Sequence, residues 1–156
     1  MKIELDKKER IMPSKKEIDD LKPITIGEVE KVELKLVGHI TAGFPSPAEE
    51  ELFESISLEE WLVKNPTSTY LVRVYGESMI EAGILPGDFV LVDRSLSPKN
   101  GDIVIAEVDG EWTMKYFRKQ GRQIVLAPAN PSYPVIKPTE SLNIFGVVVG
   151  VVRKYR

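Results

Sequence analysis

The chain of 156 residues contains no cysteine and only one histidine, His39, and these two shortages exclude several kinds of site. Without cysteine there is no disulfide framework and no thiolate metal site, and a single histidine cannot build a zinc cluster. The sequence also lacks a glycine-rich loop of the kind that holds phosphates, so nucleotide binding has no support. We therefore expect no metal and no cofactor.

Long apolar runs and an excess of positive charge are also missing. No apolar run approaches the roughly 20 residues of a membrane span, and residues 1–10 lack the apolar core of a signal peptide. The formal net charge is −3, whereas a general nucleic-acid binder shows a basic patch. We expect a cytoplasmic protein that neither contacts a membrane nor reads a DNA sequence directly.

The composition that is present favours one folded domain with an N-terminal arm. Hydrophobic residues make up 42% of the chain and charged residues 29%, which is typical of a globular protein. The first 23 residues, however, contain few large apolar groups and are interrupted by Pro13 and Pro23. Such a segment buries too little to offset its ordering entropy, which predicts a flexible arm. Residues 24–38 alternate better and could add an edge strand to the main sheet.

From residue 69 onward the pattern is that of short strands separated by tight turns. Asp109-Gly110 is a strong two-residue hairpin signal, and Ser57-Leu58-Glu59-Glu60 matches the capping box of a short helix. Predicted strands are 70–75, 88–93, 102–109, 111–118, 122–127 and 143–153. The sequence thus predicts a mainly β protein with a small, curled, antiparallel fold.

Ser78 and Lys115 are the leading candidates for chemistry. Ser78 follows a predicted strand, at a point where a short helix over 78–83 could begin, and free N–H groups there could stabilise an oxyanion. Lys115 is flanked by apolar residues, which can lower an amine's pKa until a neutral fraction can act as a base. Each residue also has a simpler interpretation: a serine that caps the helix, and a lysine on an exposed strand face.

Other combinations of side chains are weaker candidates. A Ser-His-Asp triad would need His39, which lies in or near the predicted arm. The carboxylates of Glu49-Glu50-Glu51 and Glu59-Glu60 are better explained by a solvated helix face than by a metal site. Aspartates near turns, namely Asp88, Asp93 and Asp102, need no role beyond turn hydrogen bonding.

Several short motifs, taken in their order and spacing, resemble the LexA/UmuD family of self-cleaving serine peptidases. They span about residues 40–153, and the match looks closest to the UmuD-type subunit of the error-prone DNA polymerase V. The matching segments are Ala42-Gly43-Phe44-Pro45-Ser46-Pro47-Ala48, residues 76–84, Gly87-Asp88, Val92-Asp93, residues 100–106, residues 108–111, Thr113-Met114-Lys115, Pro128-Ala129-Asn130-Pro131 and residues 145–148. One such motif would be a weak signal, but together they favour chemistry at Ser78 and Lys115.

The resemblance implies a specific fold and activity. The fold would be LexA/signal-peptidase-like, with an arm over residues 1–42 and a peptidase domain over residues 43–156. Ser78 would be the nucleophile, Lys115 its general base, and the backbone at Ser78 and Met79 the oxyanion support. The cleaved bond would be Ala42–Gly43 of the same chain or of a dimer partner.

The resemblance also implies partners. Cleavage would be stimulated by a RecA filament on single-stranded DNA after DNA damage, as part of the SOS response. The shortened product, a homodimer, would then join the catalytic subunit of an error-prone polymerase (a UmuC-like protein) in translesion synthesis.

Two other functions remain open. The chain could be a non-enzymatic regulatory module that uses its arm only for docking, or a fragment of a LexA-like or phage repressor that controls damage-response transcription. Only about 42 residues precede the expected cleavage bond, which is short for a helix-turn-helix domain plus linker. An intact Ser78-Lys115 pair favours the enzyme.

Overall fold

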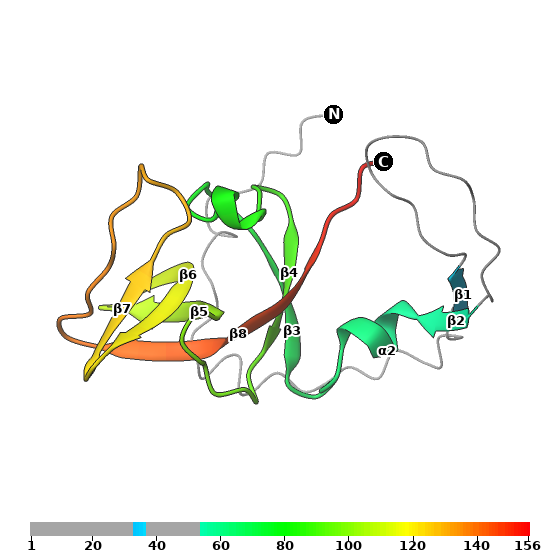
Figure 1. Cartoon of the computed structure of the whole chain (residues 1–156), viewed down its shortest axis with the longest axis horizontal. Coiled ribbons are helices and arrows are strands. Elements are labelled where there is room, and N and C mark those ends of the chain that lie inside the picture. The colour runs from blue at the N-terminus through cyan, green and yellow to red at the C-terminus, as the bar shows by residue number, and fades with distance from the viewer. Residues whose placement is uncertain (1–32, 37–53) are drawn as a thin grey trace.

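The computed structural model describes residues 33–36 and 54–156, and strands dominate this part of the chain (Figure 1). The strands are β1 (Glu33–Leu36), β2 (Glu54–Ser57), β3 (Thr69–Arg73), β4 (Phe89–Asp93), β5 (Ile103–Val108), β6 (Glu111–Gln120), β7 (Gln123–Ala127) and β8 (Leu142–Val152). Helix is limited, among the described residues, to α2 (Leu58–Leu62) and the 3₁₀ turn η2 (Ile80–Ala82). The predicted mainly β class is confirmed.

Six of the strands form one antiparallel sheet in the order β3-β4-β8-β5-β6-β7. The long strand β8 joins its two halves, because residues 142–147 pair with β5 and residues 147–152 pair with β4. Figure 1 shows β8 crossing from one half to the other. Bulges interrupt the pairing between Leu91 and Val92 and between Ile105 and Ala106. Since bulges increase the local twist, they account for the predicted curl of the sheet.

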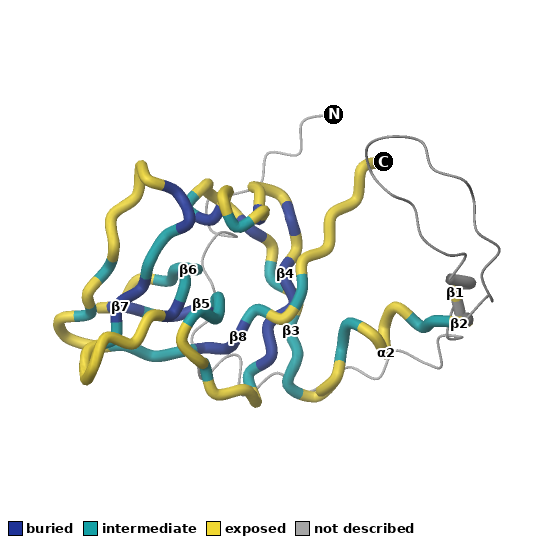
Figure 2. The backbone as a smooth tube through the Cα atoms, in the orientation of Figure 1, coloured by how far each residue is buried: buried dark blue, intermediate teal, exposed yellow. Residues whose placement is uncertain are grey.

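The sheet buries two apolar clusters, and β5 and β8 each supply residues to both; buried segments are dark blue in Figure 2. Strand β4 supplies Val90 and Val92, both fully buried, to the first cluster, as the two-residue period of a strand requires. The first cluster also contains Val74, Met79, Ile84, Ile105, Ala129 and Phe145. The second contains Val104, Ala106, Val108, Phe117, Leu126 and Val147. Met79 therefore ties the segment that carries Ser78 to the core.

The local turn and cap signals are confirmed. Asp109 and Gly110 have φ angles of 49° and 87°, and a type I′ hairpin turn requires positive φ at both positions. Ser57 caps α2 by accepting a hydrogen bond from the backbone N–H of Glu60. All six predicted strands are present, each with ends within two residues of those expected.

Two expectations about local structure are wrong. Within the predicted edge strand over 24–38, residues 33–36 do form a strand, but this β1 pairs with β2 in a separate two-stranded sheet. The helix expected over 78–83 is only the three-residue turn η2, because the chain reverses at Gly83, whose φ is 78°. None of the helices in the described ranges has the length and apolar character that a membrane span requires.

Candidate active site

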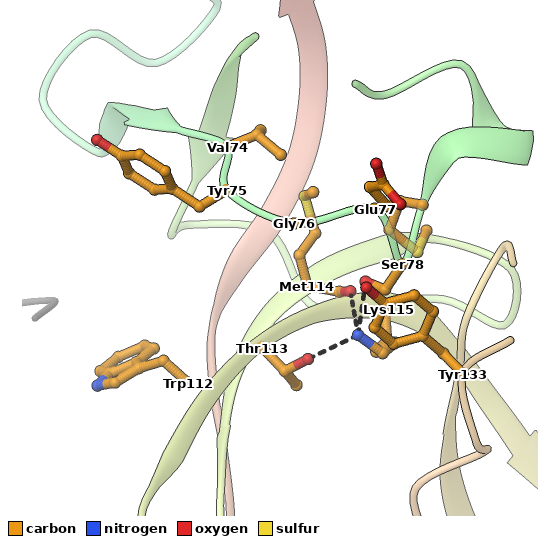
Figure 3. A pocket seen from close by; sticks show the side chains of 11 residues that line it. Val74, Tyr75, Gly76, Glu77, Ser78, Trp112, Thr113, Met114, Lys115 and Tyr133 are labelled. Atoms are coloured by element: carbon orange, nitrogen blue, oxygen red, sulfur yellow. Dashed lines mark hydrogen bonds between the residues drawn. The ribbon is translucent and has the colours of Figure 1, made fainter. Parts of the chain in front are cut away.

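Two segments that lie far apart in the sequence meet at the candidate site. Ser78 lies in the connection between β3 and η2, and Lys115 lies in the middle of β6. The Nζ atom of Lys115 is 2.8 Å from the Oγ atom of Ser78, although 37 positions separate the two residues (Figure 3). The pair singled out by the sequence is therefore in direct contact.

Strand geometry buries the lysine. The side chain of Lys115 lies on the buried face of β6, which is also the face of Thr113. In the neighbouring strand β5, Lys115 pairs with the fully buried Val104. Only 6% of its surface is exposed. The interpretation of Lys115 as a solvated surface residue is therefore wrong.

Three oxygen atoms surround the amine of Lys115. Besides Ser78 Oγ, they are Thr113 Oγ1 at 2.8 Å and the backbone carbonyl oxygen of Met114 at 3.0 Å (Figure 3). A protonated lysine donates three hydrogen bonds, whereas a neutral lysine donates two and keeps one lone pair. Thr113 and Met114 can hold the two remaining N–H groups, since a carbonyl oxygen can only accept. The lone pair of the neutral amine then points at the hydroxyl of Ser78.

The surroundings of Lys115 favour this neutral form. Burial lowers the pKa of its amine below the usual lysine range, because a charged group loses hydration there. The groups that contact the amine are two hydroxyls and a backbone carbonyl. None of them carries a negative charge that would raise the pKa of the amine back to the usual lysine range. The site therefore supplies the kind of base that a serine hydroxyl needs.

The interpretation of Ser78 as a helix cap is also wrong. The N-cap position of η2 is Met79, no side chain caps this turn, and the Ser78 hydroxyl faces Lys115 instead. Within the described residues no backbone acceptor binds the N–H of Ser78 or Met79. Because η2 has only three residues, a helix N-terminus adds little there. These two N–H groups nevertheless stay available to an oxyanion.

A pocket of about 220 Å³ opens beside the pair. One wall is the backbone from Val74 to Met79, and the other is the run from Trp112 to Lys115 on β6. Tyr133, also labelled in Figure 3, lines the same pocket. A pocket of this size between two segments of the chain suits a bound peptide with small side chains.

The carboxylates assigned to turns do hold turns. Backbone N–H groups donate to Asp88 from Leu85, to Asp93 from Ser95, and to Asp102 from Lys99. Burial alone would raise the pKa of Asp93, but hydrogen bonds from Asn65, Ser95 and Ser68 outweigh it and hold the pKa below its usual value. The described residues contain no cluster of three His, Cys, Asp or Glu side chains that could hold a metal ion.

Some predicted residues lie outside the described ranges. They are His39, the cleavage pair Ala42 and Gly43, and the run Glu49-Glu50-Glu51. Glu59 and Glu60 are described, and they lie on an exposed turn of α2 as expected.

Sequence reasoning missed two residues of the site, Thr113 and Asn130. Strand alternation placed Thr113 on the same face as Lys115, so its contact with the amine could have been anticipated. Asn130 is buried and donates from Nδ2 to the carbonyl oxygen of Glu77, the residue before Ser78. No local pattern signals this contact, which spans 53 positions of the sequence.

Comparisons with known proteins agree with the geometry. Residues 35–149 match the family model described as Peptidase S24-like. Protein SamA of Salmonella typhimurium strain LT2 is 46% identical over 115 residues, which cover 74% of this chain and 81% of SamA. The LexA repressor of Acetivibrio thermocellus is 42% identical over 136 residues, which cover 87% of this chain and 63% of the repressor.

The LexA repressor of Clostridium botulinum strain Langeland is 42% identical over 127 residues, covering 81% of this chain and 62% of the repressor. The chain thus spans slightly less than two thirds of the length of these repressors. Because the family model covers most of the chain, we conclude that the protein belongs to the Peptidase S24-like family, the LexA/UmuD family of self-cleaving serine peptidases.

Proposed function

We propose that Ser78 and Lys115 form a serine–lysine dyad with which the protein cuts its own chain between Ala42 and Gly43. The observation that carries the proposal is the 2.8 Å contact between the amine of a buried lysine and the serine hydroxyl. Cleavage divides the chain into an arm over residues 1–42 and a peptidase domain over residues 43–156.

The first step of the reaction is acylation of the serine. Neutral Lys115 accepts the proton of the Ser78 hydroxyl while Oγ attacks the carbonyl carbon of Ala42. The negative oxygen that forms is stabilised by the N–H groups of Ser78 and Met79. Collapse of this intermediate breaks the bond to Gly43, and protonated Lys115 gives its proton to the departing amine.

The second step releases the arm. Water attacks the ester that joins Ala42 to Ser78, with neutral Lys115 again accepting the proton. The ester bond breaks, the serine recovers its proton, and the arm leaves with a free carboxylate at Ala42. No metal or cofactor takes part in this scheme.

The cellular role that fits this activity is an accessory function in the SOS response to DNA damage. We infer that a RecA filament on single-stranded DNA accelerates cleavage in the cytoplasm. The shortened homodimer then assists a UmuC-like error-prone polymerase in translesion synthesis. Family membership supports this role, and addition of purified filament to the intact chain should raise the cleavage rate if the inference is right.

We predict spontaneous cleavage that becomes faster as the pH rises from about 7 to about 10, because the neutral fraction of Lys115 grows. Mass spectrometry of purified protein should find fragments that end at Ala42 and begin at Gly43. Ser78→Ala and Lys115→Ala should each abolish nearly the whole rate, since nucleophile and base act as a unit.

Matched controls separate the dyad from general effects of these substitutions. Ser141→Ala changes an exposed serine, and Lys119→Ala changes an exposed lysine on the same strand as Lys115. Both variants should cleave like the wild type. A chain that stays intact for days at alkaline pH, or is cut elsewhere, contradicts the proposal.

The repressor matches favour a second candidate, a LexA-like regulatory role in damage-response transcription. In this alternative the same domain serves as the cleavable regulatory part of a DNA-binding protein, or as a module that no longer cuts. A gel-shift assay of the intact chain on damage-inducible promoter DNA tests the first form. The cleavage assay above tests the second.

A further inference from the structure

The two N–H groups assigned to the oxyanion in the proposed reaction belong to two consecutive peptide groups, Glu77–Ser78 and Ser78–Met79. In a trans peptide the C=O and N–H bonds point in opposite directions. Whatever holds the carbonyl oxygens of Glu77 and Ser78 on one side therefore decides where the N–H groups of Ser78 and Met79 point on the other.

Both carbonyl oxygens are held by neighbouring residues of one loop. The carbonyl of Glu77 accepts a hydrogen bond from Nδ2 of Asn130 at 2.9 Å, with Ile80 N–H as a longer partner at 3.4 Å. The carbonyl of Ser78 accepts one from the N–H of Ala129 at 2.8 Å. The loop is tied to the same segment once more by the N–H of Glu81, which donates to Ala129.

Asn130 is fixed in turn by its other polar atom. Its side-chain oxygen Oδ1 accepts from the N–H of Ser132 at 3.0 Å, and the residue is only 8% exposed. A carbonyl needs a donor and an N–H needs an acceptor, so these two contacts define which way the amide group faces. The amide of Asn130 cannot turn away from Glu77 without leaving a buried polar group unpaired.

We propose that Asn130 is a positioning residue for the oxyanion site, because it holds the Glu77–Ser78 peptide with its N–H directed toward the pocket. A hydrogen bond on the carbonyl side also polarises the peptide and strengthens its N–H as a donor. This inference rests on the proposed self-cleavage and assigns a role to a residue that touches neither the hydroxyl of Ser78 nor the amine of Lys115.

The test uses the intact chain and two substitutions of Asn130. Asn130→Asp keeps the shape and the acceptor for Ser132, but it places a carboxylate oxygen against the carbonyl of Glu77 instead of a donor. Asn130→Ala removes both contacts. Asn65→Ala is the matched control, since Asn65 also donates a side-chain hydrogen bond, to Asp93, outside the site.

The first-order rate of self-cleavage is measured across the pH range for each protein, together with its unfolding temperature. Loss of one oxyanion donor costs about 100- to 1,000-fold in rate, so a misdirected donor should lower the plateau rate by about 10- to 100-fold. The midpoint of the pH profile should not move in Asn130→Ala, because this variant adds no charge and leaves the contacts of Lys115 untouched. Asn65→Ala should lose stability and keep the wild-type plateau.

The outcomes distinguish this inference from the proposed function. If the wild type is not cut, or if Ser78→Ala is cut equally well, the dyad itself is wrong. If the wild type is cut and both Asn130 variants keep a plateau within about threefold of it, the role of Asn130 is overturned. A shifted midpoint in Asn130→Ala, an equal loss in Asn65→Ala, or failure of both Asn130 variants to fold would show a merely structural residue, which also overturns it.

Discussion

At the scale of single residues, Lys115 illustrates how a functional group lowers stability. Its side chain is buried and its amine contacts only uncharged acceptors. Burial lowers its pKa in the folded state, whereas an unfolded lysine titrates near about 10.4. Between these two values the unfolded chain binds more protons, so the free energy of unfolding rises with pH in that window. Below the folded pKa the full penalty of burying a charge remains.

We therefore predict that Lys115→Met removes this rise. The comparison is made in the non-cleaving Ser78→Ala background, so that both proteins stay intact. Chemical denaturation at a series of alkaline pH values should give a free energy of unfolding that climbs toward about pH 10 with Lys115 and climbs less with methionine. Other lysines and tyrosines are common to both proteins and cancel. Parallel curves for the two proteins would mean that the pKa of Lys115 is not lowered.

Single residues also show what the sequence could and could not predict. Apolar flanks and motif spacing identified Ser78 and Lys115, and the structure brings them within hydrogen-bonding distance. Taken singly, the two residues also allowed simpler interpretations, a helix cap and a solvated lysine. These interpretations failed because burial depends on distant parts of the chain. The hairpin turn at Asp109-Gly110 places Val104 opposite Lys115, but local sequence does not specify that Ser78 contacts the amine. The contact of Asn130 with Glu77 could not be predicted for the same reason, because it joins distant parts of the sequence.

At the scale of elements, the alternation of apolar residues and the turn residues determined most of the sheet. Strand ends were predicted to within two residues because Asp109-Gly110 and similar turns limit each strand. The pairing order was not predictable, since β8 meets both β4 and β5 only through long-range contacts. The same limit explains β1, whose pattern indicated a strand but not that its partner would be β2.

The close approach of β8 to the end of β4 depends on Gly146. A Cβ atom at this position would lie 2.8 Å from Cγ1 of Val92 and 2.9 Å from the backbone oxygen of Asp93. Backbone cannot yield as a side chain can, so we predict that Gly146→Ala lowers the free energy of unfolding by about 1–3 kcal/mol, the usual cost of overpacking. Chemical denaturation measures this change.

Gly150 on the same strand provides the control. A Cβ atom there would meet Cδ1 of Leu91 at 3.2 Å, and this flexible side chain can shift by a few tenths of an ångström. Gly150→Ala should therefore cost clearly less than Gly146→Ala. Equal costs for the two substitutions would show that the close approach at Gly146 does not limit the packing.

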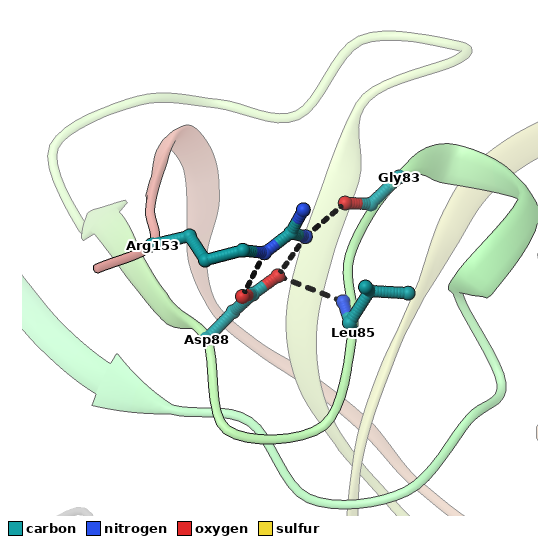
Figure 4. Close-up of polar contacts among 4 residues, drawn as sticks. All are labelled: Gly83, Leu85, Asp88 and Arg153. Carbon is teal, nitrogen blue, oxygen red and sulfur yellow. Dashed lines mark hydrogen bonds and ion pairs between the residues drawn. The ribbon is translucent and has the colours of Figure 1, made fainter. Parts of the chain in front are cut away.

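At the scale of the whole molecule, an ion pair fastens the segment after β8 to the turn before β4. The guanidinium of Arg153 donates to both carboxylate oxygens of Asp88 at 2.6 Å and to the carbonyl oxygen of Gly83 at 2.8 Å (Figure 4). The bond from Arg153, followed by that from the N–H of Leu85, lowers the pKa of Asp88 to about 2. This contact joins the end of the sheet to the segment that follows Ser78.

The lowered pKa fixes the sign of the acid dependence. The stabilisation from Asp88 is complete above the unfolded value of about 3.9 and is lost as the pH falls through about 2. Asp88→Asn should therefore unfold at a lower temperature near neutral pH and lose less stability than the wild type on acidification. Thermal unfolding of both proteins between about pH 7 and about pH 2 tests this. An equal fall in unfolding temperature for Asp88→Asn and the wild type on acidification would contradict it.

The arrangement of the whole chain also determines which bond the dyad can reach. The target peptide must come within about 3–3.5 Å of the Ser78 hydroxyl, and a glycine at position 43 lets backbone approach that closely. We predict that Gly43→Glu blocks self-cleavage while leaving Ser78 and Lys115 competent. Gly43→Glu protein is mixed with Ser78→Ala protein, whose target bond is intact, and the products are identified by mass spectrometry.

If one chain can cut another, the Ser78→Ala chain is cut in the mixture and the Gly43→Glu chain is not. If cleavage is strictly within one chain, both stay intact, and wild-type protein alone shows the fragments. Each result is compatible with a dyad at Ser78 and Lys115, because the dyad and the target bond belong to different parts of the sequence. Efficient self-cleavage of Gly43→Glu after Ala42 would instead show that the approach of the backbone at position 43 does not control the reaction.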